Sequence, residues 1–463
     1  MTSSAIKQSV AFLRSWLTYQ SHQQNLPGFA VAICYKEQLI FSEAFGWADV
    51  AAKERLTPAH LFQIGSQAKM FTMLAILQLS RELAIPLSTP ACHIIPWLAQ
   101  HADRRFRLIT IEQLLWHGAG LIRDGYPADY WQLQMPFPDK RALQQLVLAS
   151  ELLYEPGARF KYSNLGYALL GQIVEKMAGE TYTAFVGRHI LGVNFTGIQP
   201  YTPTLSSVAQ GYLPLMQAQR IPVTTRVPTH AFESVAGWYA SAPALCRFLT
   251  TFFKDGKYAF EEQNTALASP GRRGHWIPPV QRGTEYGWGF LPYNYQGHRL
   301  IGHSGSFIGH HTYGYCDPQQ EIAVVVLTNA KDAPVHHMAE GIIGTLDYFS
   351  EYGTTTPSAE QARFNGRLMN LWQTLDIVAT KDRVVSVNPD AWAPFEVINE
   401  ELIPTGEASF RISQANDLAT LDEKVTFYFD KADVLTHVNY AGSTTLPEPI
   451  YLRHIRDHQK TIK

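Results

Sequence analysis

The sequence predicts an α/β (α+β) protein in which helices flank an antiparallel sheet, a helical lobe is attached, and a small antiparallel β-domain follows. Strand-like runs occur at about 28–46 and again between about 285 and 328. The chain between about 61 and 280 is mostly helical in pattern. Near the end of the chain, apolar and polar residues alternate as in strands with one buried face.

The elements of the first 350 residues can be taken in order. An amphipathic helix is predicted at about 4–22, and a β-hairpin follows at 28–46. The run 321–328 is almost entirely apolar, which predicts a strand buried on both faces. A further helix is expected near 334–350. We expect residues 1–350 to form one domain, with the helical lobe within it.

The sequence pattern changes after residue 350. Residues 351–358 contain Thr-Thr-Thr-Pro-Ser and read as a linker. A helix is expected near 359–377. Val425, Phe427 and Phe429 then alternate with polar or amphipathic neighbours. We therefore expect residues 359–463 to form a small antiparallel β-rich domain.

Composition excludes several classes of function. The chain has 463 residues, 46% of them hydrophobic and 17% charged, with a formal net charge of −2. Nucleic-acid-binding proteins usually carry a basic patch, so we expect no nucleic-acid partner. The four cysteines, Cys34, Cys92, Cys246 and Cys316, are widely spaced and fit neither a disulfide framework nor a zinc site. We expect no metal and no cofactor.

The N-terminus gives an expectation about location. No charged segment followed by an apolar run is visible there, so no secretory signal is expected. No run approaches the ~18 apolar residues of a membrane span. We expect a cytoplasmic protein, or a periplasmic one if a leader has been removed. The oligomeric state stays open.

The first of three short motifs is Ser66-Gln67-Ala68-Lys69. The apolar run that follows predicts a buried helix, so Ser66 falls at its N-terminus and Lys69 rises on the same face. A serine needs a neighbouring base to become a nucleophile, and burial makes a lysine easier to deprotonate. The alternative is a capping serine followed by a surface lysine. Ser4-Ala5-Ile6-Lys7 fits the same pattern at the start of the first predicted helix.

The second motif, Tyr162-Ser163-Asn164, follows a Pro156-Gly157 turn and precedes a helix predicted over 165–177. A phenol near a lysine can give or take a proton. An amide can hold an ammonium group or a substrate amide through its donor and its acceptor. The alternative is a capping loop with a packed tyrosine.

The third motif, His303-Ser304-Gly305, lies in a strand-like region. Glycines at 302, 305 and 309 allow another backbone to approach closely. A substrate lying along this strand would make the backbone N–H of Ser306 a candidate oxyanion donor, paired with that of Ser66. His303 can add positive charge or bind a polar group, and a structural histidine is the alternative.

In this order the motifs resemble the serine β-lactamase and penicillin-binding-protein superfamily, whose signature is Ser-x-x-Lys, Ser/Tyr-x-Asn and a Lys-Thr-Gly-type strand. The details are similar to the class C β-lactamase-like branch, which includes esterases, D-aminopeptidases and D,D-carboxypeptidases. The stretch 108–121 is similar to that branch's ITIRHLLTHTSGL segment. The resemblance covers about residues 1–350. The C-terminal part is similar to the lipocalin-like modules attached to several related hydrolases.

The resemblance implies catalytic roles for three residues. Ser66 is the nucleophile, and Lys69 is its proton partner. Tyr162 is the acid/base that moves protons during acylation and deacylation.

The resemblance also implies the substrate-binding residues. Asn164 positions Lys69 and the substrate. His303, Gly305 and Ser306 lie on the strand edge, and the N–H groups of Ser66 and Ser306 form the oxyanion hole. Penicillin-recognising members usually carry lysine where this chain has His303. Because histidine is largely neutral at pH 7, this difference favours an esterase or peptidase over a dedicated β-lactam binder.

The sequence therefore predicts a serine hydrolase that forms an acyl-enzyme on Ser66. Its partner would be a small-molecule ester, peptide or β-lactam substrate, so esterase, D-amino-acid peptidase and weak β-lactamase activities stay open. A non-catalytic binder or scaffold that kept the fold is the alternative. The intact nucleophile, amine and phenol favour the enzyme, because a degenerate site would be expected to have lost at least one of them.

Overall fold

The computed structural model describes residues 1–223, 226–253, 256–257, 286–416 and 419–461. These residues pack into two units, one formed by Leu26–Val335 and the other by Met1–Asn25 together with His336–Lys463. Residues 258–285, which include the end of the predicted helical lobe and the start of the second predicted strand region, lie outside the described residues.

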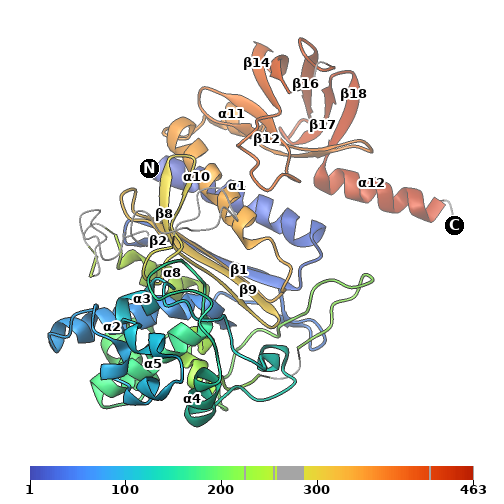
Figure 1. Ribbon diagram of the computed structural model, residues 1–463. Coiled ribbons are helices and arrows are strands. Elements are labelled where there is room, and N and C mark those ends of the chain that lie inside the picture. Colours follow the sequence, from blue (N-terminus) through green and yellow to red (C-terminus); the bar gives the residue numbers. More distant parts are fainter. Residues whose placement is uncertain (224–225, 254–255, 258–285, 417–418, 462–463) are drawn as a thin grey trace. The chain divides into compact units, whose positions relative to one another are not determined.

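The unit Leu26–Val335 is built on one antiparallel sheet (Figure 1). In spatial order its strands are β3 (Glu54–Arg55), β2 (Gln38–Asp49), β1 (Gly28–Tyr35), β10 (Ile322–Thr328), β9 (His310–Asp317), β8 (His298–Phe307) and β7 (Tyr293–Tyr295). β10 is buried along its whole length and pairs with β1 and β9. A strand covered on both faces needs an unbroken apolar sequence, which is the pattern that predicted it.

Helices gather beside this sheet and contribute a large part of the core of the same unit (Figure 1). They are α2 (Ala68–Glu82), α3 (Ile111–Leu115), α4 (Lys140–Leu148), α5 (Asn164–Ala178), α6 (Tyr182–Phe185), α7 (Glu233–Ala236) and α8 (Ala242–Thr250). A short second sheet joins β4 (Phe62–Gln63), β6 (Trp238–Ala240) and β5 (Ile198–Pro200). The antiparallel sheet and the helical part confirm the predicted fold class.

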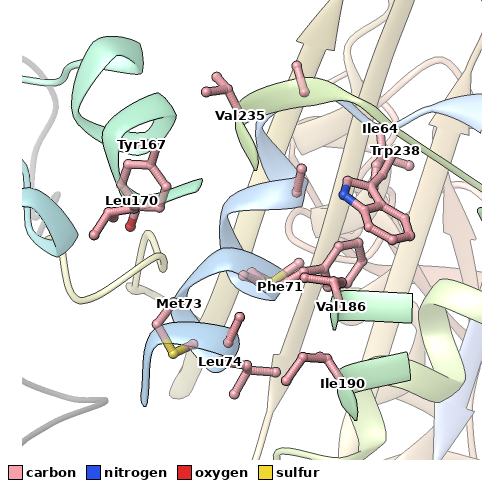
Figure 2. Packing of buried hydrophobic residues seen from close by; sticks show 14 of the residues in the cluster. Ile64, Phe71, Met73, Leu74, Tyr167, Leu170, Val186, Ile190, Val235 and Trp238 are labelled. Carbon is pink, nitrogen blue, oxygen red and sulfur yellow. The ribbon is translucent and has the colours of Figure 1, made fainter. Parts of the chain in front are cut away.

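Helix α2 is surrounded by apolar side chains on nearly all sides. Figure 2 shows Phe71 and Leu74 of this helix among side chains from several other elements. The ring centroids of Phe71 and Trp238 lie 5.5 Å apart, close to perpendicular. A helix that is apolar all round is a core helix and not a surface one. The first turn of α2 is therefore held firmly, and residues on it are well placed to form a precise site.

The second unit combines both ends of the chain. Its helices are α1 (Ser3–Gln23), α10 (Val335–Tyr352), α11 (Ala359–Ala362) and α12 (Glu448–Thr461). Ala5 of α1 packs in one apolar cluster with Tyr348 and Phe349 of α10 and with Val385 of a barrel strand. Among the described residues, no helix combines the length and the apolar character needed to cross a bilayer.

The C-terminal strands form a closed antiparallel barrel in which neighbours in sequence are neighbours in space. They are β11 (Gly366–Met369), β12 (Thr374–Ala379), β13 (Val384–Val387), β14 (Glu400–Gly406), β15 (Ser409–Ala415), β16 (Lys424–Phe429), β17 (Leu435–Tyr440) and β18 (Ser443–Pro447). β11 pairs with β18 and closes the ring. Phe364, Phe410 and Phe427 pack against one another in its core. The predicted β-rich character of this region is confirmed.

The helix predicted near 359–377 is wrong beyond its first turn. Helix α11 ends at Ala362, and the next residues form β11 and β12. The Asn370 side chain accepts hydrogen bonds from the backbone N–H groups of Trp372 and Gln373, which stabilises a tight turn there. Asparagine favours such turns because its side chain replaces a backbone partner. The turn sets the strand pairing, and this overrides the local helical pattern.

Candidate active site

Ser66 lies in a single 3₁₀ turn, Gly65–Gln67, that leads directly into α2. Gly65 has a positive φ of 54°, and a Cβ atom there would lie 2.8 Å from the backbone nitrogen of Ser306. Glycine is therefore needed twice, for its backbone conformation and for its lack of a side chain. The result is that the turn carrying Ser66 touches strand β8.

The Ser66 hydroxyl lies between an amine and a phenol. Lys69 Nζ is 3.0 Å from Ser66 Oγ, and Tyr162 Oη donates a hydrogen bond to the same oxygen at 2.9 Å. Nζ also lies 5.0 Å from the centre of the Tyr162 ring. A serine hydroxyl can donate its proton to one partner while it accepts from another. This arrangement lets the amine take the serine proton while the phenol keeps its own.

Burial sets the charge states of these two partners. Lys69 is fully buried, and desolvation holds its pKa well below the ordinary value, opposed by the negative charge of Asp124. Desolvation raises the pKa of Tyr162, and its hydrogen bond to Ser66 opposes that rise. The neutral amine and the neutral phenol are thus both favoured. A neutral amine is the form that can act as a base.

Asn164 is the first residue of α5, directly after the N-cap Ser163. Its side-chain nitrogen donates to Asp124 Oδ1 at 2.7 Å. The amide oxygen of Asn164 is buried and accepts no hydrogen bond from the described residues. An unsatisfied buried acceptor is costly, which marks this oxygen as a group available to a partner that arrives during function.

His303 is buried on β8 and is joined to Tyr286. Its Nδ1 lies 2.5 Å from the carbonyl oxygen of Ser304, and its Nε2 lies 3.3 Å from Tyr286 Oη. A carbonyl oxygen only accepts, so Nδ1 carries the proton, and Nε2 can accept from the phenol. This pairing fits a neutral imidazole. The side chain of His303 is thus occupied by a neighbouring tyrosine.

Gly305 and Ser306 bring β8 against the turn that carries Ser66. A Cβ atom on Gly305 would lie 1.8 Å from the carbonyl oxygen of Ile64, so only glycine allows this approach. β7 pairs with β8 only from His298 to Leu300. The outer edge of β8 near Ser306 is therefore not covered by β7, and the backbone of Ser306 lies next to Gly65, the residue before Ser66.

All seven predicted site residues therefore converge on one region, some directly and some through intermediates. Ser66, Lys69 and Tyr162 are in direct contact. Gly305 and Ser306 reach them through Ile64 and Gly65. Asn164 donates a hydrogen bond to Asp124, whose charge acts on Lys69. His303 is linked to this region by its contact with Tyr286.

Sequence reasoning missed three residues of this region, Asp124, Tyr286 and His117. The His117 ring lies 4.3 Å from the Tyr162 ring and 4.6 Å from the Tyr286 ring, measured between centroids. Its Nδ1 accepts the backbone N–H of Ser163 at 3.1 Å, and burial lowers its pKa. The signal available was position: His117 lies within the 108–121 stretch, Asp124 follows it closely, and Tyr286 is one of the aromatic residues in the segments expected to line the cleft.

A polar cavity of about 330 Å³ lies beside the turn between β8 and β9. Gln63, Tyr239, Phe307 and His310 are among its lining residues. Tyr239 Oη donates to Gln63 Oε1 at 3.0 Å, and burial lowers the pKa of His310 to about 4. Ser66, Lys69 and Tyr162 do not line this cavity.

Comparisons with known proteins identify the family of this chain. The Beta-lactamase family model matches residues 5–344. The protein Flp of Staphylococcus aureus strain MW2 is 28% identical over 170 residues, which is 36% of this chain and 33% of that protein. This chain thus spans only about a third of the length of that relative.

Solved structures share the fold. The octameric penicillin-binding protein homologue from Pyrococcus abyssi superposes with a TM-score of 0.64 at 21% identity, covering 94% of this chain and 99% of that one. The D-amino acid amidase from Ochrobactrum anthropi SV3, in complex with D-phenylalanine, gives a TM-score of 0.58 at 20% identity, covering 73% and 98%. With the family match over most of its length, the chain belongs to the Beta-lactamase family, within the serine β-lactamase and penicillin-binding-protein superfamily.

Proposed function

We propose that this protein is a serine hydrolase that cleaves small esters or amides through an acyl-enzyme on Ser66. The observation that carries the proposal is the position of Ser66 Oγ, within hydrogen-bond reach of both Lys69 Nζ and Tyr162 Oη. A nucleophile held by a base and a second proton carrier is the arrangement that acyl transfer requires. Family membership supports the same class of chemistry.

The reaction would proceed in two stages. In the first, Lys69 takes the proton of Ser66 as the oxygen attacks the substrate carbonyl carbon. The oxyanion that forms is stabilised by the N–H groups of Ser66 and Ser306. Tyr162 gives its proton to the leaving group as the carbon–oxygen or carbon–nitrogen bond breaks, and regains a proton from Lys69. In the second stage, Tyr162 and Lys69 take a proton from water as it attacks the acyl carbon, and they return that proton to Ser66 Oγ as the bond between this oxygen and the acyl carbon breaks.

The binding residues suit a substrate that does not depend on a positively charged side chain in the site. His303 is engaged with Tyr286 and the Ser304 carbonyl in a way that fits its neutral form. A substrate carboxylate would gain less from it than from a lysine. We therefore place esterase or D-amino-acid amidase and peptidase activity ahead of β-lactamase activity. The amidase among the structural neighbours supports a D-amino acid amide as one test substrate.

The test is a panel of acyl donors with two readouts. The purified protein is incubated with a short p-nitrophenyl ester, a D-alanyl p-nitroanilide and a chromogenic cephalosporin. Product absorbance is followed, and the intact mass is measured for an acyl adduct, which is then located by peptide mapping. We expect turnover of the ester or the anilide and an adduct on the peptide that contains Ser66. An adduct on another residue, or none with any donor, would contradict the proposal.

Tyr162→Phe tests the proton carrier. The ring packing against His117 is kept, and only the hydroxyl that reaches Ser66 is removed. We expect kcat to fall on the order of a hundredfold or more, because a general acid/base group contributes that much. The measurement is steady-state kinetics with the preferred donor. Tyr182→Phe, which removes a buried hydroxyl that hydrogen-bonds to Thr72 Oγ1 at 2.8 Å, serves as a matched control outside the Ser66 contact.

A further inference from the structure

The carboxylate of Asp124 lies close to three polar side chains near the candidate active site. Asp124 Oδ1 accepts hydrogen bonds from Asn164 Nδ2 at 2.7 Å and from Trp131 Nε1 at 2.8 Å. Its Oδ2 lies 3.1 Å from Arg123 Nε. The side chain of Asp124 is only 12% exposed, whereas that of Arg123 is 67% exposed. A carboxylate with this many fixed donors is a rigid group.

This contact decides which way the Asn164 amide faces. An ionised carboxylate can only accept hydrogen bonds, so the nitrogen of the Asn164 amide must point toward Asp124. The amide oxygen is then directed away from Asp124, and it is buried with no partner among the described residues. Without Asp124, the amide would be able to rotate and present its nitrogen instead.

Asn164 lies on the face of α5 that meets Lys69. Lys69 Nζ is 5.0 Å from the ring centre of Tyr162 and 5.5 Å from that of Tyr167. Asn164 lies one helical turn before Tyr167 on α5, so the two side chains share one side of the helix. When Lys69 takes the serine proton, its ammonium gains donors that need acceptors.

We propose that Asp124 is a positioning residue for the reaction at Ser66: it orients the Asn164 amide so that its oxygen can receive the Lys69 ammonium, and it places a negative charge beside that ammonium. The inference rests on the proposed function. The Asp124 carboxylate raises the pKa of Lys69 against the larger effect of burial.

Other charged groups also affect the pKa of Lys69 or are affected by its charge. Arg123 lowers the pKa of Lys69, and Lys69 in turn lowers that of His117. The neutral groups that face Lys69 are Ser66 and the rings of Tyr162 and Tyr167. Asp124 is the one group in this set whose charge favours the ammonium form.

The experiment compares Asp124→Asn with wild type across pH, using the donor that the wild type prefers. We expect kcat to fall roughly ten- to a hundredfold with little change in KM, since small misplacement of catalytic groups has effects of that order. We also expect the acidic limb of kcat/KM to move to lower pH. That limb reports protonation of the free enzyme's base, and loss of the anion makes Lys69 easier to deprotonate.

Three further variants complete the design. Asp129→Asn removes an exposed carboxylate nearby in sequence and should leave both kcat and the pH limb unchanged. Asp124→Glu keeps the charge, so its acidic limb should return toward that of the wild type. Trp131→Phe removes one donor to the carboxylate and should lower kcat by a smaller factor, which tests the proposal even if Asp124→Asn does not fold.

The outcomes separate the two proposals. A wild-type protein that forms no adduct on Ser66 contradicts the proposed function itself. If wild type forms the adduct but Asp124→Asn keeps its kcat and pH limb, the inference about Asp124 is overturned alone. A fall in kcat with an unmoved limb would also overturn it, because a merely structural role would produce that result.

Discussion

Replacing Ser66 with alanine should reduce hydrolysis of every ester and amide to background. Without Oγ there is no atom to carry the acyl group, and neither Lys69 nor Tyr162 is placed to replace it. Removal of a serine nucleophile costs on the order of a millionfold in kcat where the intact rate can be measured over that range. The measurement is release of p-nitrophenol by the variant and the wild type at equal concentration. Near-normal rates would contradict the mechanism.

The chain contains its own matched control for this substitution. Ser4 is followed by Lys7 with the same spacing as Ser66 and Lys69, but it lies in the first turn of α1. Its hydroxyl accepts a hydrogen bond from Gln8 Nε2 at 2.9 Å. Ser4→Ala should leave turnover unchanged. Because the two serines share a local pattern, the contrast isolates the effect of the surrounding site. Equal melting temperatures for Ser66→Ala and wild type would show that the loss is chemical.

Lys69→Met should abolish most activity and, at the same time, stabilise the fold. The side chain of Lys69 is fully buried on a helix that is otherwise packed among apolar residues. Loss of the base should lower kcat by a hundredfold or more. Replacing a buried amine with an apolar chain of similar length should raise the free energy of unfolding by on the order of 1 kcal/mol, as is common when an active-site group is removed.

The increase in the free energy of unfolding caused by Lys69→Met should depend on pH. Burial lowers the pKa of Lys69 in the folded protein below its value in the unfolded chain. At a pH below the pKa that Lys69 has in the unfolded chain, the unfolded chain binds a proton at Lys69 more readily than the folded protein does. Protonation of Lys69 therefore favours unfolding. Raising the pH toward the unfolded pKa of Lys69 removes this penalty.

The advantage of Lys69→Met should therefore be larger at pH 7 than at pH 10. Urea unfolding of both proteins at the two pH values measures it. Lys140→Met, at an exposed lysine that forms an ion pair with Glu175, is the control and should show no such gain. A stability difference that does not shrink as the pH rises would contradict the assignment of the penalty to Lys69.

The three motifs could be predicted from the sequence because each has a local signature. Ser66 and Lys69 share one helical turn, and Ser163 caps the helix that Asn164 begins. Strand β10 was predicted for a similar reason, as an unbroken apolar run. Such features depend on neighbours a few residues away, and those neighbours can be read directly.

The supporting residues could not be predicted in this way. Asp124 meets Asn164 across 40 positions of the chain, and Tyr286 meets His303 across 17. Nothing in the local pattern around Asp124 pairs it with an amide at the start of α5. The region near 359–377 failed for a related reason, since β11 pairs with β18 as well as with β12, and β18 lies far along the chain.

The division of the chain into two units has a consequence for folding during synthesis. The unit that contains Ser66 is continuous from Leu26 to Val335, so all of its strands and helices are available once that stretch has left the ribosome. Helix α1 precedes the catalytic unit in the chain, and its partners Tyr348, Phe349 and Val385 follow that unit. These contacts can therefore form only after the whole catalytic unit has been synthesised. Until then Ala5 lacks these partners, and apolar surface that stays exposed during synthesis is prone to aggregation.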